Sequence, residues 1–413
     1  MAAEQAAITT KKETTKASLP SPQKTLATVV LLSLLILNIY IFLNQGLQLG
    51  IQLWIGFLLG TALFHARFGF TSAFRRLVSV GNGEGIRAHM VMLAVASTLF
   101  AIILANGYGL FGVKPAGYVS PVGVSLIVGS FLFGVGMQLG NGCASGTLYS
   151  LGGGQSSMFI TLFGFIVGSV LGAWHFDFWI NKMPAFPAVS LADVTGSYFS
   201  AWAVQMAVFA AIFAGTLAIE RKVRPPKMKP LPTTTGWKRI IRGSWPLWTA
   251  AVVLAVLNAA TLIVRGQPWG ITSAFALWGS KAAMAVGIDV TEWAYWSGAN
   301  SQALKRSVLA DSTSVMNFGI ILGAMLASCA GGFYALRKIP LRKAAAALIG
   351  GILMGYGARL AFGCNVGAYF GGIASFSFHG WVWAVIALLG SYTALFLRPL
   401  FGLSNPNRND QFC

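Results

Sequence analysis

Repeated apolar runs constrain this chain more than any other sequence feature. An α-helix needs about 20 apolar residues to cross the roughly 30 Å hydrocarbon layer of a bilayer. Such runs lie at 26–45, 49–66, 88–107, 120–140, 156–175, 197–219, 245–264, 315–336, 342–362 and 379–398. Only 9% of the residues are charged, whereas a soluble domain carries about 25%. The sequence therefore predicts an all-α polytopic membrane protein with about 10 transmembrane helices.

The net charge of +19 is concentrated between the apolar runs. Lysines and arginines cluster at 11–24, 67–87, 221–242 and 337–343. Cytoplasmic loops of membrane proteins carry such clusters, so we expect both termini in the cytoplasm and the loop 266–315 on the other side. The sequence shows no basic groove with interleaved aromatic residues, which argues against a nucleic-acid partner.

The apolar and basic segments divide the chain into five parts. The first 25 residues are polar and show no cleavable signal pattern, which predicts a disordered cytoplasmic tail. The expected organisation is a tail at 1–25, a first transmembrane half at 26–219, a basic cytoplasmic linker at 220–244, a second transmembrane half at 245–400 and a C-terminal tail at 401–413.

Two motifs recur in the same order in the two halves. The segment 133–146 matches 354–367, so that Gly142, Cys143 and Gly146 recur as Gly363, Cys364 and Gly367. Upstream, 69–74 matches 270–275, and both copies contain Thr-Ser-Ala-Phe. Because an odd number of predicted spans separates the copies, we expect two inverted repeats, as many transporters have.

The four motif copies lie at span ends and are too short for further crossings. We therefore expect four re-entrant loops, each with a short helix that lines a central constriction. Helix N-termini favour anions, and a neutral thiol can donate a hydrogen bond to a terminal sulphur atom. The residues expected along this path are Cys143, Cys364, Gly142, Gly146, Gly363, Gly367, Asn141, Asn365, Ser145, Arg359, Gln138, Thr71, Ser72, Thr272 and Ser273.

Packing offers an alternative explanation for these residues. Buried cysteines are often small core residues, and glycines four apart often serve helix packing in membranes. Arg359 could contact an anion, form a structural ion pair or point to the interface. We expect Cys329 to serve packing and Cys413 to be inert, and we expect interfacial positions for His65 and His379.

The chain shows no sign of energy coupling or of a bound cofactor. A Walker A motif is absent, and no acidic residue lies deep within a predicted span as a proton relay would need. We therefore expect neither catalytic residues nor a metal or organic cofactor.

The Gly-Cys repeats, the segment 67–74 and the run 357–365 resemble the YeeE/YedE sulphur-transport family. The resemblance covers 50–400, and the second half, through 376–381, is most similar to the YedE branch. It implies a bacterial inner-membrane permease that passes thiosulphate, or a related small sulphur or selenium anion, by hydrogen bonding to paired cysteines. Cys143 and Cys364 match two family cysteines, whereas Gly69 occupies the place of a third. A TusA-like sulphur carrier would be a separate partner chain.

Two other functions remain open on the sequence alone. A membrane thiol enzyme could relay sulphur or a disulphide between the two cysteines, although the chain has no Cys-X-X-Cys pair. A channel-like permease for an unrelated small solute is the other alternative.

Overall fold

The computed structural model describes residues 19–229, 231 and 233–412. Residues 1–18 of the expected tail and Cys413 lie outside the described residues. The long helices are α1 (Lys24–Gln45), α2 (Leu47–Ala66), α4 (Glu84–Asn106), α5 (Val124–Leu139), α7 (Ser157–Trp174), α9 (Tyr198–Val223), α11 (Leu247–Arg265), α14 (Ser312–Gly331), α15 (Leu341–Leu360) and α17 (Phe378–Leu397). Each of them overlaps one predicted span.

Shorter elements connect the long helices. The short α-helices are α3 (Phe70–Val80), α6 (Ala144–Gly152), α8 (Leu191–Thr195), α10 (Trp237–Arg242), α12 (Thr272–Ala285), α13 (Ser301–Lys305) and α16 (Gly372–Ala374). The π-helices are η1 (Phe178–Lys182) and η5 (Asn365–Gly371), and the 3-10 turns are η2 (Ala294–Trp296), η3 (Gly298–Asn300), η4 (Val308–Ala310) and η6 (Arg398–Phe401). Strands β1 (Val122–Gly123) and β2 (Ala185–Phe186) form one antiparallel pair.

The described part of the chain is a polytopic helical membrane protein. Nine helical segments are long and apolar enough to cross a bilayer, or ten if α15 and the segment Asn365–Ala374 count as one bent span. Glycines in the left-handed conformation end several of these helices, including Gly107 after α4 and Gly266 after α11. The prediction of an all-α fold with about ten spans is confirmed.

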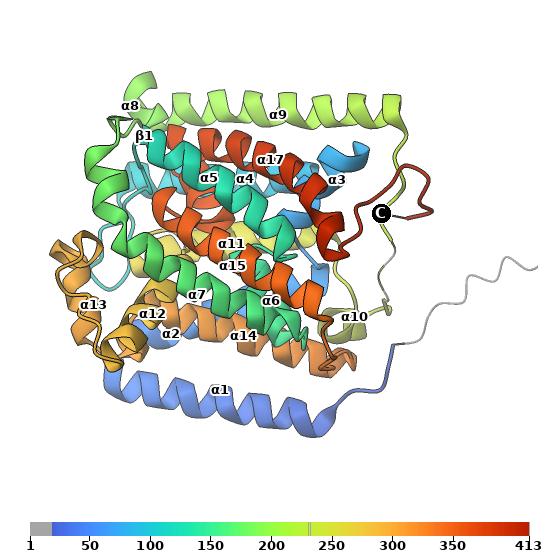
Figure 1. The fold of residues 1–413 in the computed structure, drawn as a ribbon, viewed down its shortest axis with the longest axis horizontal. Helices are drawn as coiled ribbons and strands as arrows, with labels where there is room; N and C mark the ends of the chain where they lie inside the picture. The colour runs from blue at the N-terminus through green and yellow to red at the C-terminus, as the bar shows by residue number, and fades with distance from the viewer. Residues whose placement is uncertain (1–18, 230, 232, 413) are drawn as a thin grey trace, which may run out of the picture.

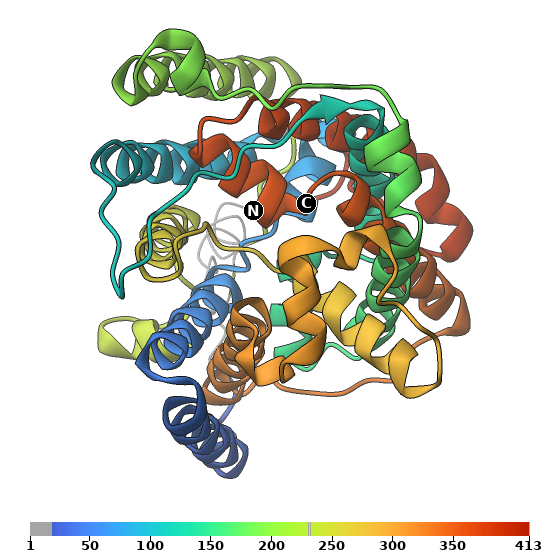
Figure 2. The same ribbon diagram turned by 90° about the vertical axis from the view of Figure 1, so that its left-hand side faces the viewer.

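The long helices lie side by side along one axis (Figure 1). At one end of the bundle lie α8 and α13, and at the other end lie α10 and the C-terminus (Figure 1). The view along the axis places α1 and α9 at the periphery (Figure 2). Peripheral side chains such as Leu43 in α1 and Phe199 in α9 are 74% and 75% exposed. Exposed apolar side chains on outer helices suit contact with lipid.

Helix packing follows the sequence repeat. The repeat relates α2 to α11, α4 to α14, α5 to α15 and α7 to α17. In the structure α2 packs on α14 and α11 packs on α4, while α7 packs on α15 and α17 packs on α5. The pair α2–α14 therefore corresponds to the pair α11–α4, and the pair α7–α15 corresponds to the pair α17–α5. This pattern agrees with an internal duplication, whereas the inverted relation of the halves stays a prediction.

Glycines bring several of these helices into backbone contact. A Cβ added at Gly60 of α2 would lie 2.1 Å from the carbonyl oxygen of Ile320 in α14. A Cβ at Gly168 of α7 would lie 2.1 Å from the carbonyl oxygen of Ile352 in α15. Since real Cβ atoms do not approach so closely, these glycines have a packing role.

The four repeated motifs lead into α3, α6, α12 and η5. Among the described helix pairs that are together apolar enough for one span and are joined by a short break, one is bent by more than 40°: α15 and the segment Asn365–Ala374, at 43°. The pairs α2–α3 and α5–α6 instead form apolar segments over 47–80 and 124–152. The re-entrant character of the four loops therefore stays a prediction.

The second half carries an extra segment between α12 and α14. In the first half only Gly81–Gly83 connects α3 to α4, whereas residues 286–311 separate α12 from α14. We call residues 286–311 the inserted segment. Its Val290, Trp296 and Leu304 form a small core with Leu277 of α12, so it packs as an ordered cap at the end of the bundle where α13 lies (Figure 1).

Candidate functional site

The two motif cysteines occupy equivalent positions at helix N-termini. Cys143 is the residue before α6, and Cys364 is the residue before η5. Two positions earlier, Asn141 and Phe362 adopt the left-handed conformation with φ of 57° and 56°. The same backbone turn therefore places each thiol at the start of a short helix. Both cysteines are 1% exposed.

Polar groups from both halves surround the thiols. The Sγ of Cys143 lies 3.4 Å from the Oγ of Ser145, and the hydroxyl of Thr71 approaches the same thiol. The Sγ of Cys364 accepts a hydrogen bond of 3.4 Å from the backbone N–H of Val366. The helices α6 and η5, which follow the two cysteines, contact each other.

Two buried polar side chains beside the thiols lack ordinary partners. The hydroxyl of Thr71 and both polar atoms of the Asn365 amide are buried without a hydrogen bond to the described residues. Asn365 is 0% exposed. Leaving a buried donor or acceptor unpaired costs about 1–3 kcal/mol. Such groups therefore indicate a place where a ligand or water completes the hydrogen bonding.

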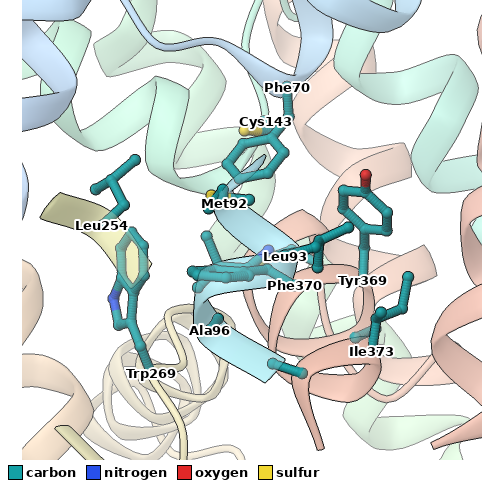
Figure 3. Packing of buried hydrophobic residues seen from close by; sticks show 14 of the residues in the cluster. Phe70, Met92, Leu93, Ala96, Cys143, Leu254, Trp269, Tyr369, Phe370 and Ile373 are labelled. Atoms are coloured by element: carbon teal, nitrogen blue, oxygen red, sulfur yellow. The ribbon is translucent and has the colours of Figure 1, made fainter. Parts of the chain in front are cut away.

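Large apolar side chains fill the space around the cysteines. Figure 3 shows Phe70 beside Cys143, with Met92 next to them and Phe370 and Tyr369 close by. The rings of Phe70 and Tyr369 meet edge to face, with 6.1 Å between their centroids. These side chains come from α3, α4 and η5, and they make the cysteine region a tightly packed constriction.

A first cavity, of approximately 380 Å³, reaches the motif that contains Cys364. It lies at the end of the bundle that the inserted segment covers, and Gly363, Gly367, Arg265 and Arg359 line it. Arg359 donates hydrogen bonds to the Oγ1 of Thr272, at 2.6 Å, and to the phenol of Tyr295 in the inserted segment.

A second cavity, of approximately 570 Å³, lies at the opposite end of the bundle. It reaches Asn141 in the motif that contains Cys143. Four cationic residues line it: Arg67, Arg337, Lys338 and Lys343. No carboxylate is among its lining residues, so this cavity carries an excess of positive charge.

The structure divides the predicted path residues among three places. The cysteine constriction contains Cys143, Ser145, Gly142, Gly146, Thr71, Cys364 and Asn365. The first cavity contains Arg359, Thr272, Ser273, Gly363 and Gly367, and the second contains Asn141.

Two predicted path residues lie outside these places and have local structural roles. The hydroxyl of Ser72 donates to the carbonyl oxygen of Gly69, at 3.0 Å, at the start of α3. The buried amide of Gln138 donates to the carbonyl oxygen of Thr71, at 3.1 Å.

None of the described carboxylates pairs with Arg359. The ion pairs of the described residues are Arg87–Glu220 and Lys182–Asp177. Arg359 is only 6% exposed and lines the first cavity. Of the three roles that the sequence left open, contact with an anion therefore agrees best with the geometry.

Sequence reasoning missed Arg265, Tyr118 and Tyr295, which all line the first cavity. Arg265 follows a predicted span directly and precedes the second motif, which was a usable signal. Tyr118 donates to the carbonyl oxygen of Phe362 in the Cys364 turn. Burial raises the pKa of Tyr118 to about 12, so its phenol remains a donor at neutral pH. No sequence pattern identified Tyr295.

The interfacial positions predicted for two histidines are wrong. His379 is 0% exposed, and its Nδ1 lies 2.5 Å from the Oγ of Ser377. His65 is 5% exposed, and its ring stacks on Trp245 with 5.3 Å between centroids. Both lie at helix ends, where neighbouring segments cover them. Cys329 is buried in α14, in agreement with a packing role.

Comparison with known proteins identifies the family. The model of a family described as sulphur transport matches residues 65–393. This chain belongs to the sulphur transport family. Thiosulfate transporter TsuA of Spirochaeta thermophila is 26% identical over 83% of this chain and 96% of its own length. Thiosulfate transporter TsuA of Escherichia coli is 26% identical over 83% and 94%.

A second group of relatives matches a shorter part of the chain. Probable transporter YedE of Escherichia coli is 32% identical over 38% of this chain and 39% of its own length. The family and these relatives identify the protein as a membrane transporter for sulphur compounds. It is not an enzyme, so the alternative of a membrane thiol enzyme is wrong.

Proposed function

We propose that the protein is a permease for thiosulphate or a closely related small sulphur or selenium anion. The anion passes from one cavity to the other between Cys143 and Cys364, and it exchanges hydrogen bonds with the two thiols on the way. The names of the TsuA relatives support thiosulphate as the first substrate to test.

The observation that carries this proposal is the pair of buried thiols with unpartnered polar groups beside them. The Asn365 amide and the Thr71 hydroxyl lack hydrogen-bond partners among the described residues. An anion between the thiols would receive hydrogen bonds from both cysteines, from Thr71 and from the amide nitrogen of Asn365. Neutral thiols suit this role better than thiolates, since a thiolate would repel an anion.

The polarity of thiosulphate matches the polarity of the constriction. Its oxygens can accept from hydroxyl and amide donors, and its terminal sulphur suits the soft thiols and the sulphur of Met92. The rings of Phe70, Phe370 and Tyr369 lie around this region (Figure 3), and such apolar surroundings suit a substrate that has shed most of its hydration shell. Sulphate, which lacks the terminal sulphur, would lose more on entering.

The predicted topology completes the proposal. The basic second cavity and α10 face the cytoplasm of a bacterial inner membrane, both termini lie on that side, and the first cavity opens on the other side. The two inverted halves are 26–219 and 245–400, joined by the basic linker 220–244. A separate TusA-like carrier that receives sulphur would then meet the cavity lined by Arg337, Lys338 and Lys343.

Uptake into proteoliposomes tests the proposal. The purified full chain is reconstituted, and the initial rate of ³⁵S-thiosulphate uptake is measured for the wild type, Cys143→Ala, Cys364→Ala and Cys329→Ala. Each motif substitution removes a donor from the path, so we expect a rate loss of about tenfold or more, in line with the loss of one hydrogen bond to a charged group.

Cys329→Ala is the matched control, because Cys329 is equally buried but lies in α14 away from the path. We expect this variant to keep its uptake rate. Unchanged uptake in both motif variants would refute the role of the thiols. Absence of thiosulphate uptake by the folded wild type, with uptake of another sulphur or selenium anion, would correct the substrate.

A further inference from the structure

The basic linker contains a short helix whose two faces differ in chemistry. Successive residues of an α-helix point about 100° apart around its axis. On this count α10 carries three apolar side chains on one face and three cations on the other: Trp237, Ile240 and Ile241 against Lys238, Arg239 and Arg242. Residues 221–246 contain no aspartate or glutamate, so the whole linker is positively charged. α10 is therefore a basic amphipathic helix.

The described part of the protein leaves the apolar face of α10 largely uncovered. Trp237 is 84% exposed, Ile241 62% and Ile240 51%. Lys238 and Arg239 are exposed as well. With six residues, α10 is far too short to cross a bilayer. Exposed apolar and cationic side chains on opposite faces of one helix are typical of helices that lie in the plane of a membrane surface.

α10 lies at the level where several membrane-spanning helices begin or end. Residues 243–246 alone separate it from the start of α11. α10 packs on α14, and the Nε of Arg242 donates to the carbonyl oxygen of Ala330, at 2.8 Å, near the end of α14. The N–H of Gln23, just before α1, donates to the carbonyl oxygen of Cys329 at 2.9 Å. Since α1, α11 and α14 are all candidate spans, their common end corresponds to a bilayer surface, and α10 lies there.

Hydrogen bonds to the backbone fix α10 against the bundle. The Nη2 of Arg242 donates to the carbonyl oxygen of Pro20 at 2.7 Å, and the indole of Trp245 donates to the carbonyl oxygen of Ile240 at 3.1 Å. Trp248, in the first turn of α11, is exposed. Tryptophans gather at membrane–water interfaces because their rings combine an apolar body with a polar N–H. This end of the bundle therefore presents exposed indole rings at the level of an interface.

We propose that α10 binds the headgroups of anionic phospholipids at the bilayer surface. Its three apolar side chains enter between the acyl chains, and the ammonium of Lys238 and the guanidinium of Arg239 donate to lipid phosphates. Long basic side chains can reach the headgroups from a helix whose other face lies among acyl chains. Each cation near an anionic surface adds to the attraction, whereas a zwitterionic lipid carries a cation that offsets it.

The position of α10 favours lipid over a protein partner. An acidic protein could pair with its cations, but the apolar face lies where α1 and α11 also expose apolar side chains, such as Val29 and Trp248. Apolar surface at the ends of spanning helices suits acyl chains. The lack of carboxylates in 221–246 complements the negative charge of anionic headgroups. This lipid-binding surface does not depend on the proposed transport function.

A fluorescent label on each face of α10 tests whether the apolar face enters the bilayer. In the full chain with Cys413→Ser, either Ile240→Cys or Lys238→Cys introduces a labelling site, and the two sites point about 160° apart. The chain is labelled with the environment-sensitive fluorophore NBD and reconstituted into nanodiscs of phosphatidylcholine and phosphatidylglycerol. The remaining cysteines are buried: Cys143, Cys329 and Cys364. We expect acyl-brominated lipids to quench the label at position 240 at least about threefold more strongly than the label at position 238.

Two results of the labelling experiment would overturn the proposal. Emission typical of water at position 240, or equal quenching at both positions, would mean that the apolar face does not enter the bilayer. A blue-shifted emission at position 240 without quenching by brominated lipids would mean that a second copy or another protein covers the helix.

Native mass spectrometry of the full chain in detergent tests the preference for anionic lipid. The chain is titrated with phosphatidylglycerol or phosphatidylcholine, and the Kd of the first bound lipid is compared. Each cation at an anionic surface contributes about fivefold. We expect the wild type to bind phosphatidylglycerol about tenfold more tightly, and Lys238→Gln/Arg239→Gln to reduce this ratio below about threefold.

Lys227→Gln/Lys229→Gln is the matched control, because it removes two exposed cations from the same linker outside α10. It should keep the wild-type ratio, and both variants should keep the wild-type melting temperature. An unchanged ratio in folded Lys238→Gln/Arg239→Gln, or an equal loss in the control, would refute α10 as the binding surface. Displacement of phosphatidylglycerol by excess sn-glycerol 3-phosphate would assign the cations to a free phosphate instead. No sulphur anion is present, so these outcomes are independent of thiosulphate transport.

Discussion

The two halves of the protein place the same thiol in the same turn but surround it differently. Asn141 and Phe362 adopt nearly identical φ angles, and Cys143 and Cys364 are equally buried. Five residues before each cysteine, however, the first half has Gln138 and the second has Arg359. Duplication has therefore preserved the backbone of the site while the electrostatics of its two sides have diverged.

The contacts of this residue pair show how the divergence is accommodated. Gln138 donates to the carbonyl oxygen of Thr71, and its amide oxygen lies 3.4 Å from the Nη1 of Arg75. Arg359 donates to the Oγ1 of Thr272, the repeat equivalent of Thr71. Each side chain thus reaches across to the preceding motif of its own half. The neutral Gln138 lies beside Arg75 and Arg398. For Arg359, Arg265 is the one other cation among the described residues that line the first cavity.

Substitution of Gln138 by arginine should have the largest effect on this comparison. The new guanidinium would lie beside Arg75, and Arg398 already donates to the carbonyl oxygen of Gln138. Burying a further cation without a carboxylate costs several kcal/mol. We expect Gln138→Arg to give little folded protein, or a melting temperature lower by at least about 5 °C. Size-exclusion profiles and thermal unfolding in detergent measure this.

The reverse change should affect transport more than folding. Arg359→Gln makes the second half resemble the first and removes one of the two guanidinium groups from the first cavity. We expect the half-saturating concentration for thiosulphate uptake to rise about tenfold, as for a lost hydrogen bond to a charged group, with a near-normal melting temperature. Arg359→Lys should recover part of the affinity. If Arg359→Gln is folded and transports with normal affinity, Arg359 serves only as a hydrogen-bond partner of Thr272.

The two motif threonines should differ in a smaller but measurable way. The hydroxyl of Thr272 is bonded to Arg359, whereas the hydroxyl of Thr71 lies near the Cys143 thiol without an ordinary partner. Thr272→Val should lower the melting temperature by a few degrees, because it removes a partner from a buried guanidinium. Thr71→Val should leave stability unchanged but slow uptake about threefold to tenfold. Equal loss of stability in both variants would mean that Thr71 is structural rather than a path residue.

Features with a local sequence signal were predictable. The spans follow from the length of the apolar runs, and the positions of Cys143 and Cys364 follow from the repeat. Asn365 lies beside Cys364 because it is the next residue in the sequence. These properties depend on the chain itself or on its neighbours in sequence.

Features that depend on tertiary packing were not predictable. Tyr295 reaches Arg359 only because the inserted segment folds back over α12, and no periodic pattern reveals this. Burial of His379 depends on its contacts with Ser377 and Tyr118. After equivalent cysteines, α6 is an α-helix whereas η5 is a π-helix, so equal motifs do not ensure equal helix geometry.

The proposed function depends on passage of an anion between the two motif cysteines. A structure of the full chain solved with bound thiosulphate, and with its selenium analogue selenosulphate to mark the terminal atom, tests it most directly. We expect density between Cys143 and Cys364, with the terminal chalcogen toward the thiols and the oxygens toward Thr71 and Asn365. Density in the first cavity alone, or anion density at the constriction that persists unchanged in the Cys143→Ala/Cys364→Ala variant, would contradict it.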